Sequence, residues 1–213
     1  MTSLLIFGAG GHGKVVAETA RAMDNWQEIV FADDAYPGVK VVSGYPVIAD
    51  FSDARSLDGT HPDVIVAIGD NHKRAELTMQ LQASGFNPVI LVHPAAVVAE
   101  SARIEMGTVI FAQAVVQADA HIGRAVIINT AATVDHDCVI GKGVHLSPGV
   151  HLGGEVRVDD YSWLGVGAVV INRVTIGQEV IVGAGSCVTG DLPDKVTVVG
   201  VPARPLRRHS PAD

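Results

Sequence analysis

The sequence is short of aromatic residues and of basic charge, and each shortage excludes a class of protein. Only 5% of its 213 residues are Phe, Trp or Tyr although 48% are hydrophobic, so a core has to be filled by aliphatic side chains. Fifteen Lys and Arg residues stand against 23 Asp and Glu residues, which gives a formal net charge of −8. We therefore expect no nucleic-acid partner, because a phosphate backbone requires a basic surface.

Cysteines and long hydrophobic runs are also scarce. The two cysteines, Cys138 and Cys187, are too few for a disulfide framework or a cysteine-based zinc site, and we expect buried thiols in a reducing compartment. The first residues, Met1 to Phe7, contain neither the basic segment of a signal peptide nor an apolar run long enough to cross a membrane. We expect a cytoplasmic protein without a membrane span.

What the sequence does have is a six-residue repeat in its second half. Sixteen consecutive sixth residues are aliphatic, and a small or medium-sized side chain follows four positions later. Neither the 3.6-residue helical period nor the two-residue strand period produces this series, whereas short strands joined by corners do. The segment is predicted to be a parallel β-helix with three hexads per coil and about five coils, which stack about 4.8 Å apart. The aliphatic series is Val98, Ile104, Ile110, Val116, Ile122, Ile128, Val134, Ile140, Leu146, Leu152, Val158, Leu164, Val170, Ile176, Val182 and Val188.

The first part of the chain has a different pattern, in which short apolar strands alternate with helical segments. This alternation predicts a parallel sheet with crossover helices, a Rossmann-like α/β unit. The pattern changes to hexads near His93, so we expect an α/β domain over 1–93 and a β-helix domain with a C-terminal cap over 94–213. The expected strands are 4–7, 29–32 and 64–68, and the expected helices are 14–23 and 73–83.

A glycine-rich turn follows the first expected strand and matches the dinucleotide fingerprint. Its glycines are Gly8, Gly10 and Gly13, and Asp33 comes about twenty residues later, where an acid that binds a ribose is expected. Backbone amides at a helix N-terminus bind phosphate oxygens, and Lys14 could add charge. Because the unit holds one mononucleotide half only, a phosphate-bearing nucleotide or nucleotide sugar is favoured over nicotinamide chemistry. A purely structural turn is the alternative.

One of the nine histidines, His136, is flanked by two acids at a predicted corner of the β-helix. A carboxylate beside an imidazole fixes its orientation and makes it a better base, although a surface histidine in an ion pair would have the same sequence. Residues eighteen apart stack, so Gly154 should lie beside His136 in the next coil. His145 follows half a coil later, but no third His or Cys at ligand spacing accompanies the two, and we expect no metal.

Together these motifs resemble the nucleotide-sugar N-acetyltransferases of the left-handed β-helix superfamily, in the group that includes sialic acid O-acetyltransferase-like proteins. The strongest likeness is to bacterial enzymes that acetylate the 4-amino group of UDP-linked 4-amino-4,6-dideoxy sugars for surface glycan or glycoprotein biosynthesis. The resemblance covers nearly the full length, including a C-terminal segment that is common to many hexapeptide acyltransferases. The segments that carry it are 6–14, 31–34, 67–71, 128–130, 135–141 and 199–203.

The resemblance implies acetyl-CoA as co-substrate, a homotrimer with active sites between neighbouring β-helices, and no metal. It assigns the general base to His136 and its acidic partner to Asp137. For acetyl-CoA it assigns His145 to the acetyl end and the Gly154 amide to the thioester carbonyl, with Val166 and Ala184 also on the cofactor. For the nucleotide sugar it assigns Gly10, His12, Gly13, Lys14, Asp33, Asp34 and Asn129.

Three alternatives stay open at this point. The acceptor could be a sugar hydroxyl, as in sialic-acid-type O-acetyltransferases of the same fold. The carrier nucleotide could be GDP instead of UDP. The chain could also be a nucleotide-sensing scaffold whose β-helix serves only for assembly, in which case it would bind nucleotide without binding coenzyme A.

Overall fold

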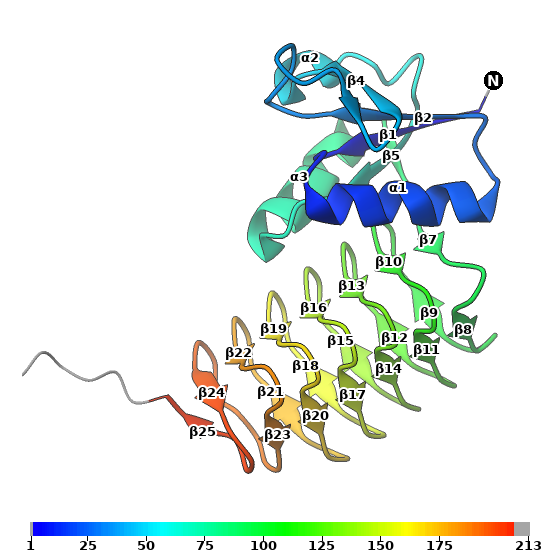
Figure 1. Cartoon of the computed structure of the whole chain (residues 1–213). Helices are drawn as coiled ribbons and strands as arrows, with labels where there is room; N and C mark the ends of the chain where they lie inside the picture. The colour runs from blue at the N-terminus through cyan, green and yellow to red at the C-terminus, as the bar shows by residue number, and fades with distance from the viewer. Residues whose placement is uncertain (1, 207–213) are drawn as a thin grey trace, which may run out of the picture.

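The structure, a computed structural model, describes residues 2–206 and consists of an α/β half followed by a three-sided prism of short strands (Figure 1). Residues 207–213, which include the last residues of the expected C-terminal cap, lie outside the described part. Both halves were predicted from the sequence, and the architecture confirms this fold class.

The α/β half is a six-stranded sheet in the order β3-β4-β2-β1-β5-β6, parallel except for the β3–β4 pair. The chain leaves β1 towards β2 and β4, then returns to the other side of β1 with β5. Ligands bind at such a switch point, beyond the carboxyl ends of the strands. The elements are β1 (Ser3–Phe7), α1 (Gly11–Met23), β2 (Glu28–Ala32), β3 (Val41–Val42), β4 (Tyr45–Ala49), α2 (Phe51–Ala54), β5 (Asp63–Val66), α3 (Asn71–Ala83) and β6 (Asn87–Pro88).

Two helices begin earlier than the sequence predicts. Helix α1 begins at Gly11, inside the glycine turn, and α3 begins at Asn71, where the Asp70 carboxylate accepts a hydrogen bond from the Lys73 amide at 2.9 Å. Asp is a preferred N-cap residue, so the sequence already indicated that this helix could begin directly after Asp70. The elements β3, β4, α2 and β6 were not predicted.

The prism is built from three sheets, parallel except for the β24–β25 pair, which we call faces I, II and III. Face I is the eight-stranded sheet, face II the six-stranded sheet and face III the five-stranded sheet, and the chain visits them in that order in every coil. Because β7 pairs with β10, the first prism strand lies just before residue 94. The strands of face I are β7 (Leu91–Val92), β10 (Val109–Ile110), β13 (Ile127–Ile128), β16 (His145–Leu146), β19 (Trp163–Leu164), β22 (Ile181–Val182), β24 (Thr197–Val199) and β25 (Arg204–Pro205). Those of face II are β8 (Val97–Val98), β11 (Val115–Val116), β14 (Thr133–Val134), β17 (His151–Leu152), β20 (Val169–Val170) and β23 (Cys187–Val188). Those of face III are β9 (Arg103–Ile104), β12 (His121–Ile122), β15 (Val139–Ile140), β18 (Arg157–Val158) and β21 (Thr175–Ile176).

The aliphatic series predicted from the hexads forms the interior of the prism and packs into one continuous core. Corners between faces contain a residue with left-handed backbone conformation, such as Asp119, Asp137 and Glu155 along the edge between faces II and III. Cys138 is buried as expected, whereas Cys187 is half-buried, and both are free thiols. No helix within residues 2–206 is long and apolar enough to cross a membrane.

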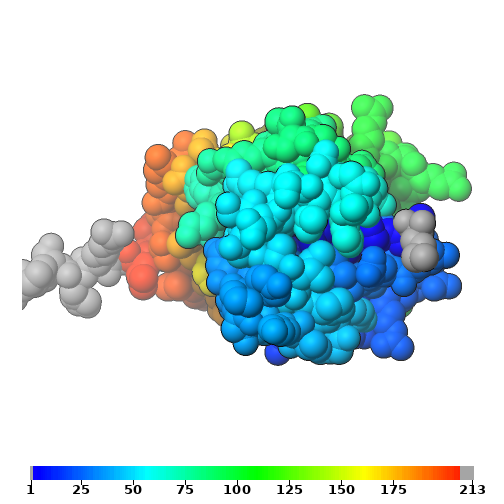
Figure 2. Space-filling model, turned by 90° about the horizontal axis from the view of Figure 1, so that it is seen from above, coloured from blue at the N-terminus to red at the C-terminus, as the bar shows by residue number. Residues whose placement is uncertain are grey.

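The α/β half sits on face I and on the edge between faces III and I. Helix α1 packs on β7, and Val109, Phe111 and Ile127 of the prism share a core with β1 and β2. Seen from above, this half covers much of the prism while the C-terminal coils extend beyond it (Figure 2). The edge between faces II and III is the corner opposite face I and lies away from the α/β half.

Candidate active site

The glycine turn at the end of β1 lets neighbouring backbone segments pack closely against it. Gly8 has a φ of +109°, and a Cβ there would lie 2.8 Å from the Ala67 carbonyl oxygen. A Cβ on Gly13 would collide with the Gly8 carbonyl oxygen, so this glycine lets α1 pack against β1. A Cβ on Gly10 would meet nothing within 4 Å, and Gly10 is the N-cap of α1 without a side-chain cap. The first amides of α1 are therefore open to an anion.

A pocket of about 400 Å³ opens beside this turn. Ala9, Gly10, Lys14 and Asp33 line it, together with residues of the 35–43 segment. The Asp33 carboxylate accepts hydrogen bonds from the Ala9 amide at 2.8 Å and from the Ala35 amide at 2.9 Å. It thus braces the turn and keeps unused lone pairs towards the pocket. Three of the residues predicted for the nucleotide sugar, Gly10, Lys14 and Asp33, meet here.

The other residues predicted for the nucleotide sugar lie elsewhere. Asp34 accepts a hydrogen bond from the Phe51 amide at the start of α2, at 3.2 Å. His12 points towards the prism, with its ring edge-on to Phe111 at 5.6 Å between centroids. Its Nε2 is buried without a hydrogen-bond partner in the described residues, and burial followed by the charge of Arg74 lowers its pKa to about 4. The roles assigned to these residues stay predictions.

His136 lies on the edge between faces II and III, next to the predicted Gly154. Its Nδ1 lies 2.8 Å from Asp137 Oδ2, because the left-handed conformation of Asp137 turns the carboxylate back towards the ring. A Cβ on Gly154 would lie only 2.5 Å from Nε2, so the bare glycine makes room for the imidazole. With Nδ1–H donating to Asp137, Nε2 is the free basic nitrogen.

The surroundings of His136 favour its protonated form. The hydrogen bond to Asp137 is the largest effect and raises its pKa; desolvation, the next largest, opposes it, and the charges of Asp135, Asp137 and Glu155 raise the pKa further. Half of the His136 side chain is exposed, at 50%, so a substrate could reach it. A base with a raised pKa and free access is suited to accepting a proton near neutral pH.

His145 has the opposite surroundings. It is the outward residue of β16 on face I, and burial, followed by the charges of Arg74 and His12, lowers its pKa to about 3. Asn129 Oδ1 accepts a hydrogen bond from the Thr130 amide at 2.9 Å. This contact turns Asn129 Nδ2 towards His145 Nε2, which lies 3.2 Å away. Nε2 therefore accepts, and the neutral ring carries its proton on Nδ1. The structure thus brings together His145 and Asn129, which the sequence assigned to different ligands.

A cavity of about 530 Å³ separates His145 from the start of α3. Trp163 continues the outward column of face I below His145, with 6.4 Å between ring centroids, and its side chain donates a hydrogen bond to Ser147 at 2.8 Å. The remaining lining includes two acids, Asp70 and Glu179. Sequence reasoning missed Trp163 and the acids, although an outward aromatic residue in a chain with two tryptophans was a usable signal. The full lining is Gly69, Asp70, Asn71, His72, His145, Tyr161, Trp163, Glu179 and Ile181.

The remaining residues predicted to bind acetyl-CoA, Val166 and Ala184, lie at successive corners of the edge between faces I and II. Both are exposed, Val166 at 57%. His136 and Gly154 lie on a different edge, so one chain does not bring all the predicted cofactor residues together. Within residues 2–206 no three His, Cys, Asp or Glu side chains form a metal-binding cluster.

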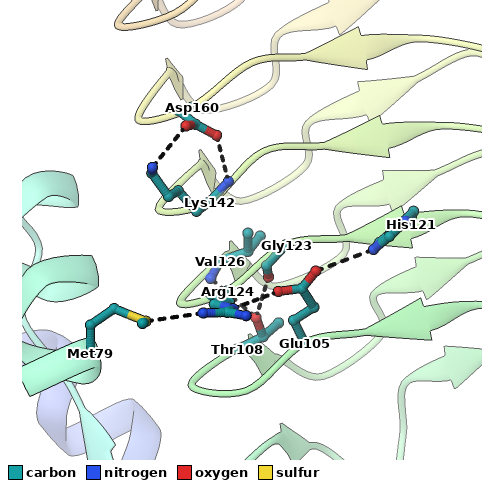
Figure 3. A network of polar contacts seen from close by, with 9 residues as sticks. All are labelled: Met79, Glu105, Thr108, His121, Gly123, Arg124, Val126, Lys142 and Asp160. Carbon is teal, nitrogen blue, oxygen red and sulfur yellow. Dashed lines mark hydrogen bonds and ion pairs between the residues drawn. The ribbon is translucent and has the colours of Figure 1, made fainter. Parts of the chain in front are cut away.

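A larger cavity, of about 730 Å³, lies on the far side of α3 over the edge between faces III and I. Its charged side chains pair with one another: Arg124 with Glu105 at 2.8 Å and Lys142 with Asp160 at 3.2 Å (Figure 3). Because these cations already have acidic partners, this cavity lacks the free positive charge that a phosphate group needs.

Comparisons with known proteins agree with this geometry. The PglD N-terminal domain family matches residues 3–81. The acetyltransferase domain of PglB from Neisseria gonorrhoeae FA1090, solved with acetyl coenzyme A, is 46% identical, with a TM-score of 0.93 over 96% of this chain and 98% of that chain. PerB from Caulobacter crescentus, solved with CoA and GDP-perosamine, is 42% identical, with a TM-score of 0.90 over 97% and 98%.

Among curated relatives, GDP-perosamine N-acetyltransferase of Escherichia coli O157:H7 is 32% identical over 95% of this chain and 96% of its own length. Other matches are shorter. The chain spans 30% of a putative acetyltransferase of Schizosaccharomyces pombe and 52% of UDP-N-acetylbacillosamine N-acetyltransferase of Bacillus subtilis. Since the full-length similarities extend over both halves, the chain belongs to the nucleotide-sugar N-acetyltransferases of the left-handed β-helix, or hexapeptide-repeat, family.

Proposed function

We propose that this protein is an acetyl-CoA-dependent N-acetyltransferase that acts on the 4-amino group of a nucleotide-linked 4-amino-4,6-dideoxy sugar. The observation that carries the proposal is the free Nε2 of His136, which faces a bare glycine while Asp137 holds the other ring nitrogen. The pocket of about 400 Å³ beside the glycine turn supports a nucleotide-linked acceptor. Such an enzyme would modify amino sugars for bacterial surface glycans or glycoproteins.

The chemistry follows from the placement of these groups. The neutral amine attacks the thioester carbonyl, the new C–N bond forms, and His136 Nε2 takes the proton that the amine loses. The C–S bond then breaks, and the imidazolium returns the proton to the leaving thiolate. The Gly154 amide has no backbone partner in the described part of the chain, so we assign it to the carbonyl oxygen that gains charge in the transition state.

The acceptor and the base do not meet within one chain, which is why we propose a homotrimer. The nucleotide pocket and His145 lie on the side of face I, whereas His136 lies on the opposite edge. Face II, which borders that edge, carries exposed apolar side chains, Val97 at 63% and Val169 at 39%. Packing face II around a threefold axis would cover them and bring His136 of one chain to the acetyl-CoA residues of the next.

The decisive experiment offers the purified protein acetyl-CoA with UDP- and GDP-linked 4-amino-4,6-dideoxy sugars, and with their 4-hydroxy analogues. Release of free thiol and the mass of the sugar product are measured. We expect acetylation of an amine, with UDP as the carrier; the similarity to GDP-perosamine enzymes makes GDP the alternative. Acetylation of the hydroxyl analogue instead would make the protein an O-acetyltransferase. Failure to bind CoA in calorimetry would leave only a nucleotide-binding scaffold.

The matched variant is His136→Ala. Loss of the base should lower kcat by about 10²- to 10⁴-fold, while both substrates still bind. Calorimetry on the variant separates loss of binding from loss of catalysis. Turnover equal to that of the parent protein would remove His136 from the mechanism.

A further inference from the structure

A buried arginine, Arg74 on α3, joins the two halves of the molecule. It is 1% exposed and is among the largest fully buried side chains. On the prism, its Nε donates to the Ala125 carbonyl and its Nη2 to the Gly143 carbonyl, both at 2.8 Å. On the α/β half, Nη1 donates to the carbonyls of Ile68 at 3.0 Å and Gly69 at 3.3 Å. The guanidinium thus ties the loop after β5 to two successive coils.

This arginine has no carboxylate partner within ion-pair distance in residues 2–206, and burial lowers its pKa to about 9. Arg124, in the same interface, differs in both respects, because Glu105 neutralises it and 43% of its side chain is exposed (Figure 3). Burying a charge without an ion-pair partner is costly even where, as with Asp70 here, a carboxylate acts on it from beyond ion-pair distance, and hydrophobic packing often stabilises an interface as well. A charge kept under these conditions points to a role other than stability.

The contacts of Arg74 converge on the His145 cavity. Gly143, whose carbonyl it binds, precedes His145 by two residues. Nη2 also donates to Asn71 Oδ1 at 2.8 Å, and the Asn71 side chain in turn donates from Nδ2 to the Tyr161 carbonyl at 2.9 Å. Gly69, Asn71 and Tyr161 line the cavity of about 530 Å³ that His145 faces. Arg74 therefore fixes the wall of this cavity from both halves.

We propose that Arg74 is a positioning residue of the transfer reaction, which holds the coil carrying His145 against the nucleotide-binding half and keeps His145 an uncharged Nδ1–H donor towards the cavity. The proposal rests on the proposed function and deepens it. A 4-amino sugar reaches the enzyme as an ammonium ion, and a cationic His145 would repel it. A neutral donor binds a carbonyl or hydroxyl oxygen of either substrate and leaves His136 as the proton acceptor.

The charge on His145 depends on groups from several elements. Burial opposes protonation of His145 most strongly and lowers its pKa, and the positive charge of Arg74 and then His12 of α1 act in the same direction. On the prism, Asn129 Nδ2 donates a hydrogen bond to His145 Nε2. A protonated imidazole has no lone pair on Nε2 and could not accept this bond. The other titratable groups that share the cavity are Asp70, His72, Tyr161 and Glu179.

The test is nuclear magnetic resonance of the imidazole nitrogens in the full chain between pH 5 and pH 8, which reports tautomer and charge without requiring catalysis. In the parent protein we expect His145 as neutral Nδ1–H throughout. In Arg74→Met, His145 should begin to titrate within this range, because the opposing charge is lost and because the cavity wall that buries the ring, which is the larger cause of its low pKa, is no longer held in place. A parent His145 that carries its proton on Nε2, or that titrates near its ordinary pKa of about 6.5, overturns the proposal.

Kinetics supply the second readout, measured well below the unfolding temperature of each variant. Arg74→Met should lower kcat by about 10-fold or more with little change in the KM for acetyl-CoA, because the wall of the site shifts. Arg74→Lys keeps the positive charge but loses the several N–H donors of the guanidinium group, so we expect a lower kcat with His145 still neutral. Arg124→Met is the matched control and should leave kcat and the His145 signals unchanged.

If Arg74→Met folds, has the kcat of the parent protein and keeps His145 neutral, then Arg74 has only a structural role and the proposal is overturned. If Arg74→Met does not fold, the parent spectrum and Arg74→Lys decide. Failure of the proposed function is a separate result, because it appears as a parent protein that transfers no acetyl group whatever the state of His145.

Discussion

At the residue scale, the molecule places two histidines in opposite surroundings. His136 is half-exposed and paired with a carboxylate, which raises its pKa, whereas His145 is buried near an arginine, which lowers its pKa to about 3. Groups whose surroundings push their pKa values apart mark the acid and base assignments of a site. Under the proposed function, we therefore expect His136 to exchange protons near neutral pH and His145 to stay neutral.

The pH profile tests the pair of His136 and Asp137. The base acts only when neutral, so kcat/KM should fall as the pH drops through a His136 pKa that lies above its ordinary value. In Asp137→Asn the hydrogen bond to a charge is lost, the pKa falls, and this acid limb moves to lower pH. The plateau should drop about 10²-fold because the imidazole is less well oriented. Asp119→Asn, at the same corner position one coil earlier, is the control, and an unmoved limb in Asp137→Asn would contradict the pairing.

The space beside His136 can be tested with one methyl group. In Gly154→Ala the new Cβ would lie 2.5 Å from Nε2, so the imidazole has to rotate away. We expect kcat to fall about 10²-fold while the unfolding temperature changes little, because only the end of a side chain has to move. Gly190→Ala lies in the same column of corners, where a Cβ meets nothing within 4 Å, and should behave as the parent. Parental kcat in Gly154→Ala would mean that the glycine is not needed for the base.

At the element scale, the strand-turn-helix unit of β1 and α1 separates packing from binding. Gly13→Ala brings a Cβ onto the Gly8 carbonyl. Because the Cβ is fixed rigidly to the backbone and the carbonyl belongs to it, neither can move aside easily, and we expect a loss of about 1–3 kcal/mol in unfolding free energy. Gly10 has an ordinary φ of −72° and open space, so Gly10→Ala should fold as the parent. Its Cβ stands at the phosphate pocket and should raise the KM for the nucleotide sugar. Thermal unfolding and initial rates check both, and reversed effects would contradict the anion site.

The repeat and the glycine turn were predictable because each depends on local rules. An aliphatic side chain every six residues has one packing solution, and the prism follows it throughout the expected range. The three glycines have the distinct roles that the fingerprint predicts: a left-handed turn, open space and close packing. Pairing of His136 with Asp137 is also local, since the two are adjacent.

What the sequence did not predict depends on distant contacts. The edge strand β3 has only two residues, and Pro46 interrupts the pattern of its neighbour β4, so no periodicity marks either strand. Arg74 belongs to a helix rich in polar residues, where an arginine usually faces water. It is buried only because α3 lies against the prism corners that contain Ala125 and Gly143. The chain order of the motifs does not reveal that interface.

At the scale of the whole molecule, the nucleotide pocket and the proposed base, His136, lie on opposite sides of a three-sided prism. The α/β half covers face I, and His136 lies on the edge opposite to it. No hinge is needed if a second copy supplies the missing edge. The proposed trimer would make a second chain part of each site, and it predicts that two different inactive chains can repair each other.

Mixed trimers test this prediction directly. His136→Ala removes the base, whereas Gly10→Asp places a carboxylate at the N-cap of α1, where it favours the helix but repels a diphosphate. The two variants carry different tags, are co-expressed, and are purified through both tags. In any trimer that contains both chains, about one site in three combines an intact base with an intact nucleotide pocket, so about a third of the parental activity should return. A chain with both substitutions, co-expressed with His136→Ala, is the control and should stay inactive. Mixed trimers without activity would mean that His136 serves the nucleotide pocket of its own chain.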